Sequence, residues 1–93
     1  MTAPLIRYSA AACQTDLPNP LGREDMRKNT DRIAAMIDQA VAGAAPFLPV
    51  RLVVFPEFAH AAPVYPTLEE LRRHLAIPVP NEHTERLHAK AKE

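Results

Sequence analysis

Cysteine is scarce in this sequence, and long apolar runs are absent. The one cysteine, Cys13, excludes an internal disulfide framework and fits a reducing compartment. No stretch approaches the roughly 20 consecutive apolar residues that span a bilayer. Near the N-terminus, Arg7 and Ser9 interrupt any apolar segment that an export signal would need. We therefore expect a soluble cytoplasmic protein that does not bind membranes.

The sequence also lacks an excess of charge of either sign. Eleven Lys and Arg residues balance eleven Asp and Glu residues, so composition does not favour nucleic acid or an anionic membrane as a partner. Apolar residues make up 47% and charged residues 24%, which is typical of a soluble globular protein and too apolar for disorder. A domain of this size buries only about 60 to 65% of the surface of its unfolded chain, so we expect one domain with a modest core.

The apolar pattern predicts two strands separated by a helix. Residues 5–14, LIRYSAAACQ, are small and apolar and predict a strand buried on both faces or nearly so. Residues 26–42 have apolar side chains at helical spacing, and Gly43 is the expected helix end. The β-branched run at 51–55, RLVVF, predicts a second strand that stops at Pro56. Together these elements predict a right-handed βαβ unit with parallel strands.

Two shorter helices are predicted after the second strand. Thr67 and Glu70 have the spacing of a capping box at the start of a helix over 67–75. Asn81 is placed to cap a last helix over 82–93. Two strands make a ribbon that has too few strands for independent stability and exposes unpaired edges. We therefore expect an incomplete domain that self-associates or lies within a larger protein.

A carboxylate follows the second predicted strand directly. Glu57 comes after Phe55 and Pro56 in the run RLVVFPEF. An ionised carboxylate in apolar surroundings loses hydration unless a cation or hydrogen-bond donors contact it. Gln14 and Glu57 both lie past the carboxyl ends of their predicted strands, the edge at which ligands and catalytic groups gather in open parallel sheets. Glu57 is therefore either a solvated residue at a strand end or a functional carboxylate.

The order of these features resembles the N-terminal third of the nitrilase superfamily of carbon–nitrogen hydrolases. The matching features are the first strand ending in AACQ, the helix that begins near KNTDRI, and LVVFPE, which is similar to the family's signature around its catalytic glutamate. The resemblance covers essentially the whole chain and implies that residues 1–93 are the N-terminal part of a carbon–nitrogen hydrolase domain. The implied fold class is α/β, the N-terminal βαβ portion of a nitrilase-type αββα sandwich, incomplete here.

The resemblance also implies a chemistry. Family members hydrolyse amides or nitriles, at C–N bonds other than peptide bonds, through a Glu-Lys-Cys triad in which the thiolate attacks, the lysine stabilises the tetrahedral intermediate and the glutamate is the general base. Only the glutamate carries over, to Glu57, because Lys90 and Lys92 are the only lysines after it and no cysteine follows. The intact enzyme would need no metal or organic cofactor, since the thiolate supplies the nucleophile. We expect a small-molecule amide or nitrile substrate, a homo-oligomer, and no activity in the 93-residue chain alone.

Other candidate residues have weaker signals. His60, three residues beyond Glu57, and Tyr65, in the following loop, are predicted to contact substrate, although loop aromatics more often pack than bind. The four histidines lack metal-ligand spacing, so no metal site is expected. Cys13, in an alanine-rich strand, is interpreted as a small core residue. The alternatives to a hydrolase segment are a non-catalytic α/β interaction module, which completes its sheet with another chain, and a truncated product.

Overall fold

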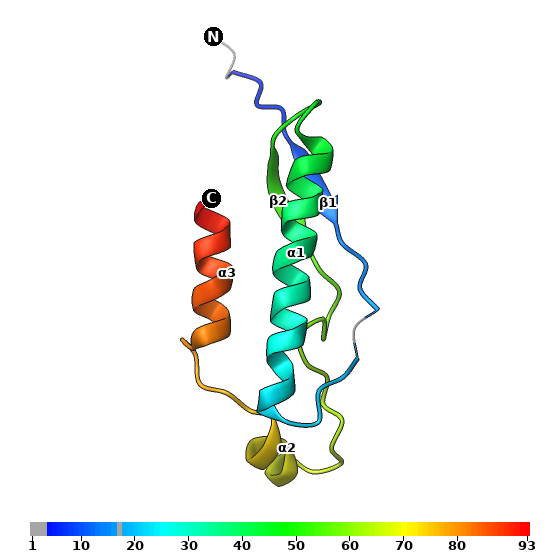
Figure 1. The fold of residues 1–93 in the computed structure, drawn as a ribbon, viewed down its shortest axis with the longest axis vertical. Coiled ribbons are helices and arrows are strands. Elements are labelled where there is room, and N and C mark those ends of the chain that lie inside the picture. The colour runs from blue at the N-terminus through cyan, green and yellow to red at the C-terminus, as the bar shows by residue number, and fades with distance from the viewer. Residues whose placement is uncertain (1–3, 17) are drawn as a thin grey trace.

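The computed structural model describes residues 4–16 and 18–93 and shows a mixed α/β chain. Its elements, in chain order, are strand β1 (Ser9–Ala12), the 3-10 turn η1 (Arg23–Asp25), helix α1 (Met26–Ala44), strand β2 (Val50–Val54), helix α2 (Leu68–His74) and helix α3 (Glu82–Lys92). Helix α1 lies along the two strands, α3 runs beside α1, and α2 lies near the N-terminal end of α1 (Figure 1). Across the described ranges, none of the helices has the length and apolar character needed to cross a bilayer.

The two strands pair in parallel, which confirms the predicted strand-helix-strand unit. Ala10 is opposite Leu52 and Ala12 is opposite Val54. One further ladder bond follows, in which the Cys13 N–H donates to the Val54 carbonyl at 2.8 Å. Because parallel strands end at the same side of a sheet, Cys13 and the chain after Val54 leave the sheet at one shared edge.

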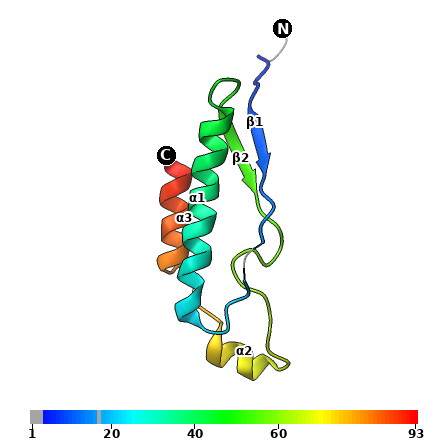
Figure 2. The ribbon, with the colours of Figure 1, turned by 45° about the vertical axis from the view of Figure 1, so that its right-hand side comes forward.

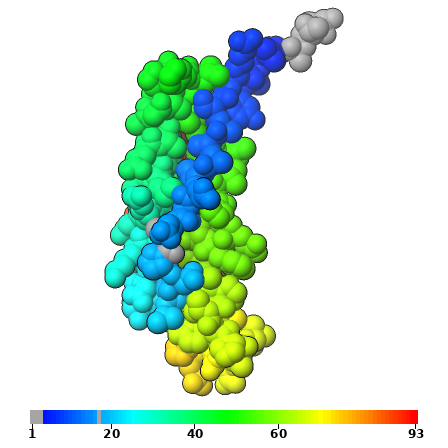
Figure 3. All heavy atoms as spheres, turned by 90° about the vertical axis from the view of Figure 1, so that its right-hand side faces the viewer, coloured from blue at the N-terminus to red at the C-terminus, as the bar shows by residue number. Residues whose placement is uncertain are grey.

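Strand β1 is shorter and more exposed than its sequence pattern predicts. It spans four residues in place of the predicted 5–14, and its residues alternate between half-buried and exposed. The prediction of a strand buried on both faces is therefore wrong. Helix α1 covers one face of the strands (Figure 2), and residues 4–8 lie on the surface (Figure 3), where Leu5 and Ile6 are exposed. Small apolar residues become a buried strand only when neighbouring elements cover both faces.

Helix α1 begins at the predicted residue but runs past Gly43. It ends at Ala44, and the Ala45 N–H donates to the Val41 carbonyl at 3.1 Å. The prediction that Gly43 ends the helix is therefore wrong. Glycine ends a helix by adopting a positive φ, which Gly43 does not have. The two alanines that follow it are strong helix formers, so the helix continues.

The core is small and nearly half of it is polar. The buried apolar residues are Pro20, Met26, Ile33 and Leu75, and the buried polar residues are Asn29, Thr30 and His83. Four of these seven side chains come from the first two turns of α1, at the spacing i, i+3, i+4, i+7 that forms one helix face. The N-terminal half of α1 is thus the centre of the fold, and polar contacts carry much of its packing.

Side chains cap the two short helices at the predicted residues. The Thr67 hydroxyl accepts the Glu70 N–H at 3.2 Å at the start of α2. The Glu70 carboxylate does not return a bond to the Thr67 N–H, so the predicted capping box is only half formed. Asn81 accepts two backbone N–H groups at the start of α3, and the Thr84 hydroxyl accepts the Asn81 N–H at 2.8 Å, which completes a capping box. At the other end of α2, the Arg23 guanidinium donates to three main-chain carbonyls. This contact satisfies carbonyls that a helix end leaves unpaired.

Candidate functional site

Glu57 lies in a tight turn directly after β2. The turn runs from Pro56 to Ala59, and the Ala59 N–H closes it by donating to the Pro56 carbonyl at 3.2 Å. Phe58 has a φ of 63°, which for a bulky L residue costs about 1–3 kcal/mol and persists only where the surrounding structure holds it. Such residues cluster at functional sites. The turn places Glu57 at the carboxyl edge of the parallel sheet, where the sequence predicted it.

The Glu57 side chain is exposed to solvent. No hydrogen bond or ion pair joins its carboxylate to a residue of the ranges 4–16 and 18–93. The neighbouring Phe55 is half-buried and Phe58 is 54% exposed, so water can reach the carboxylate. Within this chain Glu57 is therefore a solvated carboxylate, and its role as a general base stays a prediction.

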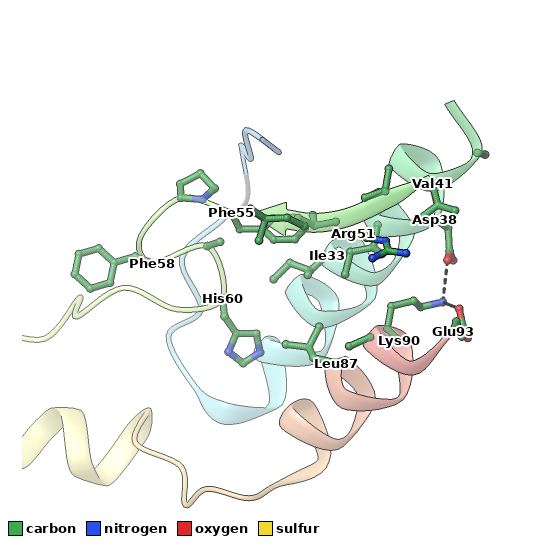
Figure 4. A pocket seen from close by; sticks show the side chains of 18 of the residues that line it. Ile33, Asp38, Val41, Arg51, Phe55, Phe58, His60, Leu87, Lys90 and Glu93 are labelled. Atoms are coloured by element: carbon green, nitrogen blue, oxygen red, sulfur yellow. Dashed lines mark hydrogen bonds and ion pairs between the residues drawn. The ribbon is translucent and has the colours of Figure 1, made fainter. Parts of the chain in front are cut away.

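An apolar groove of about 930 Å³ opens beside this turn. Its walls come from α1, β2, the loop after β2, and α3 (Figure 4). Pro56 and Phe58, the two neighbours of Glu57 in the chain, both line the groove, whereas Glu57 does not. The groove has the size and apolar character of sites that bind small molecules. The predicted apolar stripe of α1 contributes to it, because Ile37 and Val41 line the groove and are not packed in the core.

A charged triplet lies at the end of the groove remote from Phe58 (Figure 4). Lys90 Nζ is 2.9 Å from Asp38 Oδ1 and 3.1 Å from Glu93 Oε2. The hydrogen bond to Asp38, followed by the one to Glu93, raises the pKa of Lys90. Lys90 is thus held as a charged, paired side chain away from the Glu57 turn.

His60 lies where α1, the loop after β2 and α3 meet, and its ring belongs to a buried polar cluster. His60 Nε2 is 2.8 Å from Thr30 Oγ1, and His83 Nδ1 is 2.7 Å from the same oxygen. The Thr30 hydroxyl donates to the Met26 carbonyl at 3.1 Å. A hydroxyl has one hydrogen and two acceptor positions, so both imidazole nitrogens donate an N–H to Thr30 Oγ1. This arrangement saturates the hydroxyl of Thr30, a residue that is 0% exposed.

The main chain of His60 is held as well as its ring. Asn29 Nδ2 donates to the His60 carbonyl at 2.8 Å and to the Pro18 carbonyl at 3.1 Å. Two adjacent residues of α1, Asn29 and Thr30, therefore fasten the loop that carries the Glu57 turn. Burial lowers the pKa of His60, and the neighbouring His83 lowers it further. His60 also lines the groove, while its contact with a substrate stays a prediction.

Tyr65 lies outside the groove. Its hydroxyl donates to the Leu21 carbonyl, and its ring stacks on His74 with the ring centroids 4.8 Å apart. These contacts fasten the loop after the Glu57 turn to α2. The structure thus gives Tyr65 a packing role, the plainer of the two interpretations from the sequence, and a contact between Tyr65 and substrate stays untested.

Sequence reasoning did not identify Asn29, Thr30 or His83. The first two carried a signal, because they fall between Met26 and Ile33 on the apolar face of the predicted helix, where polar residues need partners. In the two described ranges, no group of three or more His, Cys, Asp and Glu residues could hold a metal ion. Cys13 is half-buried beside the same sheet edge and is not a core residue.

Comparison of the chain with models of protein families, with curated proteins and with solved structures gave no match.

Proposed function

We propose that this chain is the segment of a carbon–nitrogen hydrolase that carries the general base, with Glu57 in that role. The observation that carries the proposal is the position of Glu57: it follows a parallel strand at the carboxyl edge of the sheet, in a turn with a positive φ at Phe58, beside an apolar groove. Functional groups of open α/β sheets gather at this edge. The resemblance of LVVFPE to the signature of the nitrilase superfamily supports the same assignment.

The proposed chemistry requires two more groups. Glu57 would take the proton of a thiol, the thiolate would attack the carbon of an amide or nitrile, and an ammonium group would stabilise the anionic intermediate. For an amide, the amine or ammonia then leaves with a proton, and water, activated by Glu57, releases the acid from the thioester. No cysteine follows Glu57, and Lys90 is paired with Asp38. Polypeptide outside these 93 residues would have to supply the thiol and the ammonium group, and would complete the nitrilase-type sandwich.

The exposed carboxylate is compatible with this role. A general base must reach the proton that it removes, and its hydrogen bonds often form only when the other reacting groups are present. The groove next to it offers an apolar wall for the substrate's acyl or nitrile substituent, as small-molecule sites generally do. The proposed substrate is therefore a small amide or nitrile with an apolar part.

The test is ammonia release from amides and nitriles by an assembly that contains this chain together with the thiol and the ammonium group. Glu57→Gln should lower kcat by at least about 100-fold, because glutamine keeps the volume but cannot accept the proton. Glu85→Gln, which changes an exposed glutamate of α3 in the same way, should leave kcat unchanged. A folded Glu57→Gln variant with normal kcat would contradict the proposal.

A non-catalytic interaction module is the second candidate. It is favoured by the solvated state of Glu57 and by the exposed apolar side chains Leu52 and Val54 on β2. Exposed apolar strands tend to pair with further strands. Sedimentation of the 93-residue chain separates the cases: a stable, specific oligomer without hydrolase activity in any assembly would favour the module.

A further inference from the structure

We propose that the cluster of Asn29, Thr30, His60 and His83 is a latch that positions the Glu57 turn on α1 and releases it when the His60 imidazole is protonated. The latch rests on the proposed function, because it would regulate the same site. Its geometry stands independently of that function. Its members come from three parts of the fold, α1, the loop after β2, and α3. The two imidazole rings meet at the single oxygen Thr30 Oγ1, and Asn29 holds the His60 carbonyl.

The first argument is the short connection between the latch and the turn. Ala59 closes the turn and His60 is the next residue, held through its carbonyl by Asn29 and through its ring by Thr30. A shift of His60 therefore displaces the turn directly. The positive φ of Phe58 also needs external support to persist. The His60 anchor is adjacent in the chain and provides such support.

The second argument concerns which ring nitrogens of His60 and His83 already carry a hydrogen. The nitrogens that face Thr30 Oγ1 already carry hydrogens, so an added proton must go to His60 Nδ1 or His83 Nε2. His83 Nε2 has an anion nearby, since Glu82 Oε1 is 3.8 Å away.

A positive charge on His60 has no comparable partner. The ring centroids of His60 and His83 are 4.6 Å apart, and an N–H of each ring points at the same oxygen. A charge added to the half-buried His60 would therefore be repelled at close range by the N–H of the buried His83. The nearby charges are already engaged. On α3 and α1, Glu82 pairs with Arg27, and Arg86 pairs with Asp31.

The loop itself contributes Glu57, an exposed carboxylate that makes no contact with His60 among the described residues. Relief of the repulsion therefore requires that the His60 loop or α3 move away from α1. Such a movement would shift the Glu57 turn or remove the support that the His60 anchor gives to Phe58.

The direction of the pH effect follows from the environment of His60. Its pKa in the folded chain lies below the ordinary value of 6.5, first because of burial and second because of His83. The unfolded or released state then binds the proton more readily than the latched state. The latch therefore contributes fully above pH 6.5 and loses its contribution as the pH falls through the lowered pKa.

An NMR titration of the 93-residue chain from pH 8 to pH 5 tests the latch without substrate. In the wild type, the amides of Ala59 and His60 should become mobile as the pH falls through the lowered pKa of His60. His60→Gln places an amide nitrogen where Nε2 was and does not titrate. This variant should keep the turn ordered at pH 5. His88→Gln should behave like the wild type.

Thr30 provides an independent check on the shared oxygen. Thr30→Val removes the hydroxyl and should make the turn mobile at every pH, whereas Thr30→Ser keeps the hydroxyl and should restore the wild-type pH response. If Thr30→Val does not fold, as judged by circular dichroism, the His60→Gln and Thr30→Ser variants decide the question. A turn that stays ordered at pH 5 in the wild type, or a pH response that persists in His60→Gln, would overturn the proposal.

The latch and the proposed hydrolase function can fail separately. The titration follows backbone order and imidazole protonation, and neither measurement depends on turnover. A normal kcat in Glu57→Gln with a working latch would remove the catalytic role alone. A large loss of kcat in Glu57→Gln with no pH response would remove the latch alone.

Discussion

Replacement of Thr30 by valine measures how much the buried polar cluster contributes to stability. Valine has nearly the shape of threonine, so the change opens no large cavity. It removes the oxygen that lies 2.8 Å from His60 Nε2 and 2.7 Å from His83 Nδ1. The two ring N–H groups then lose their acceptor, and the valine methyl group keeps water from replacing it.

The magnitude follows from the burial of the two rings. A buried polar group without a partner costs about 1–3 kcal/mol. His83 is buried and bears the larger share, while His60 is half-buried, so water reaches part of its ring and its share is smaller. We expect the free energy of unfolding to fall by about 2–4 kcal/mol. Complete domains of this length have only about 5–14 kcal/mol in total, and a fold with two strands has less to lose, so the loss would be readily measured.

Urea unfolding followed by circular dichroism is the assay. The midpoint should fall while the denaturant slope stays unchanged, because the variant exposes the same surface on unfolding. Thr15→Val, the same chemical change in a half-buried loop residue outside the cluster, should stay within about 0.5 kcal/mol of the wild type. A Thr30→Val variant equally close to the wild type would show that the hydroxyl is not an essential acceptor, and would refute the reasoning.

Two further substitutions test the helix ends. Asn81→Ala removes the acceptor of two backbone N–H groups at the start of α3 and should lower the free energy of unfolding by about 1 kcal/mol; the control is the exposed Asn19→Ala, and an equal effect of both would contradict the cap. Arg23→Gln removes the cation that contacts three carbonyls at the end of α2. It should speed amide hydrogen exchange in α2 and cost up to about 1 kcal/mol, unlike the exposed Arg7→Gln; unchanged exchange would show that the contact does not hold the helix.

Local sequence was enough to locate the helices and their first residues. The caps at Thr67 and Asn81 depend on side chains that bond to backbone groups two or three residues away, so a short sequence contains both partners. The same holds for the start of α1, whose apolar period is a property of residues one turn apart. The position of Glu57 after β2 was also predictable, because a β-branched run that stops at a proline marks a strand end.

The extent of β1 and the environment of Glu57 could not be read from local sequence. Residues 5–14 are apolar enough for a buried strand, yet only four of them pair, because β2 offers partners for that length and α1 covers one face. Glu57 has apolar neighbours in the chain but is exposed, since the turn that carries it directs it away from the groove. Burial depends on which surfaces meet, and that is a property of the whole fold.

The buried polar cluster shows the same division. The period of α1 by itself puts Asn29 and Thr30 on the inner face of the helix. Their partners are remote: His60 is 30 residues and His83 is 53 residues from Thr30 along the chain. Hydrogen bonds at such separations form only after the loop and α3 have packed against α1. Sequence therefore determined that α1 has polar groups to satisfy, and tertiary structure decided that two histidines satisfy them, because only packing brings such distant side chains within 3 Å of one oxygen.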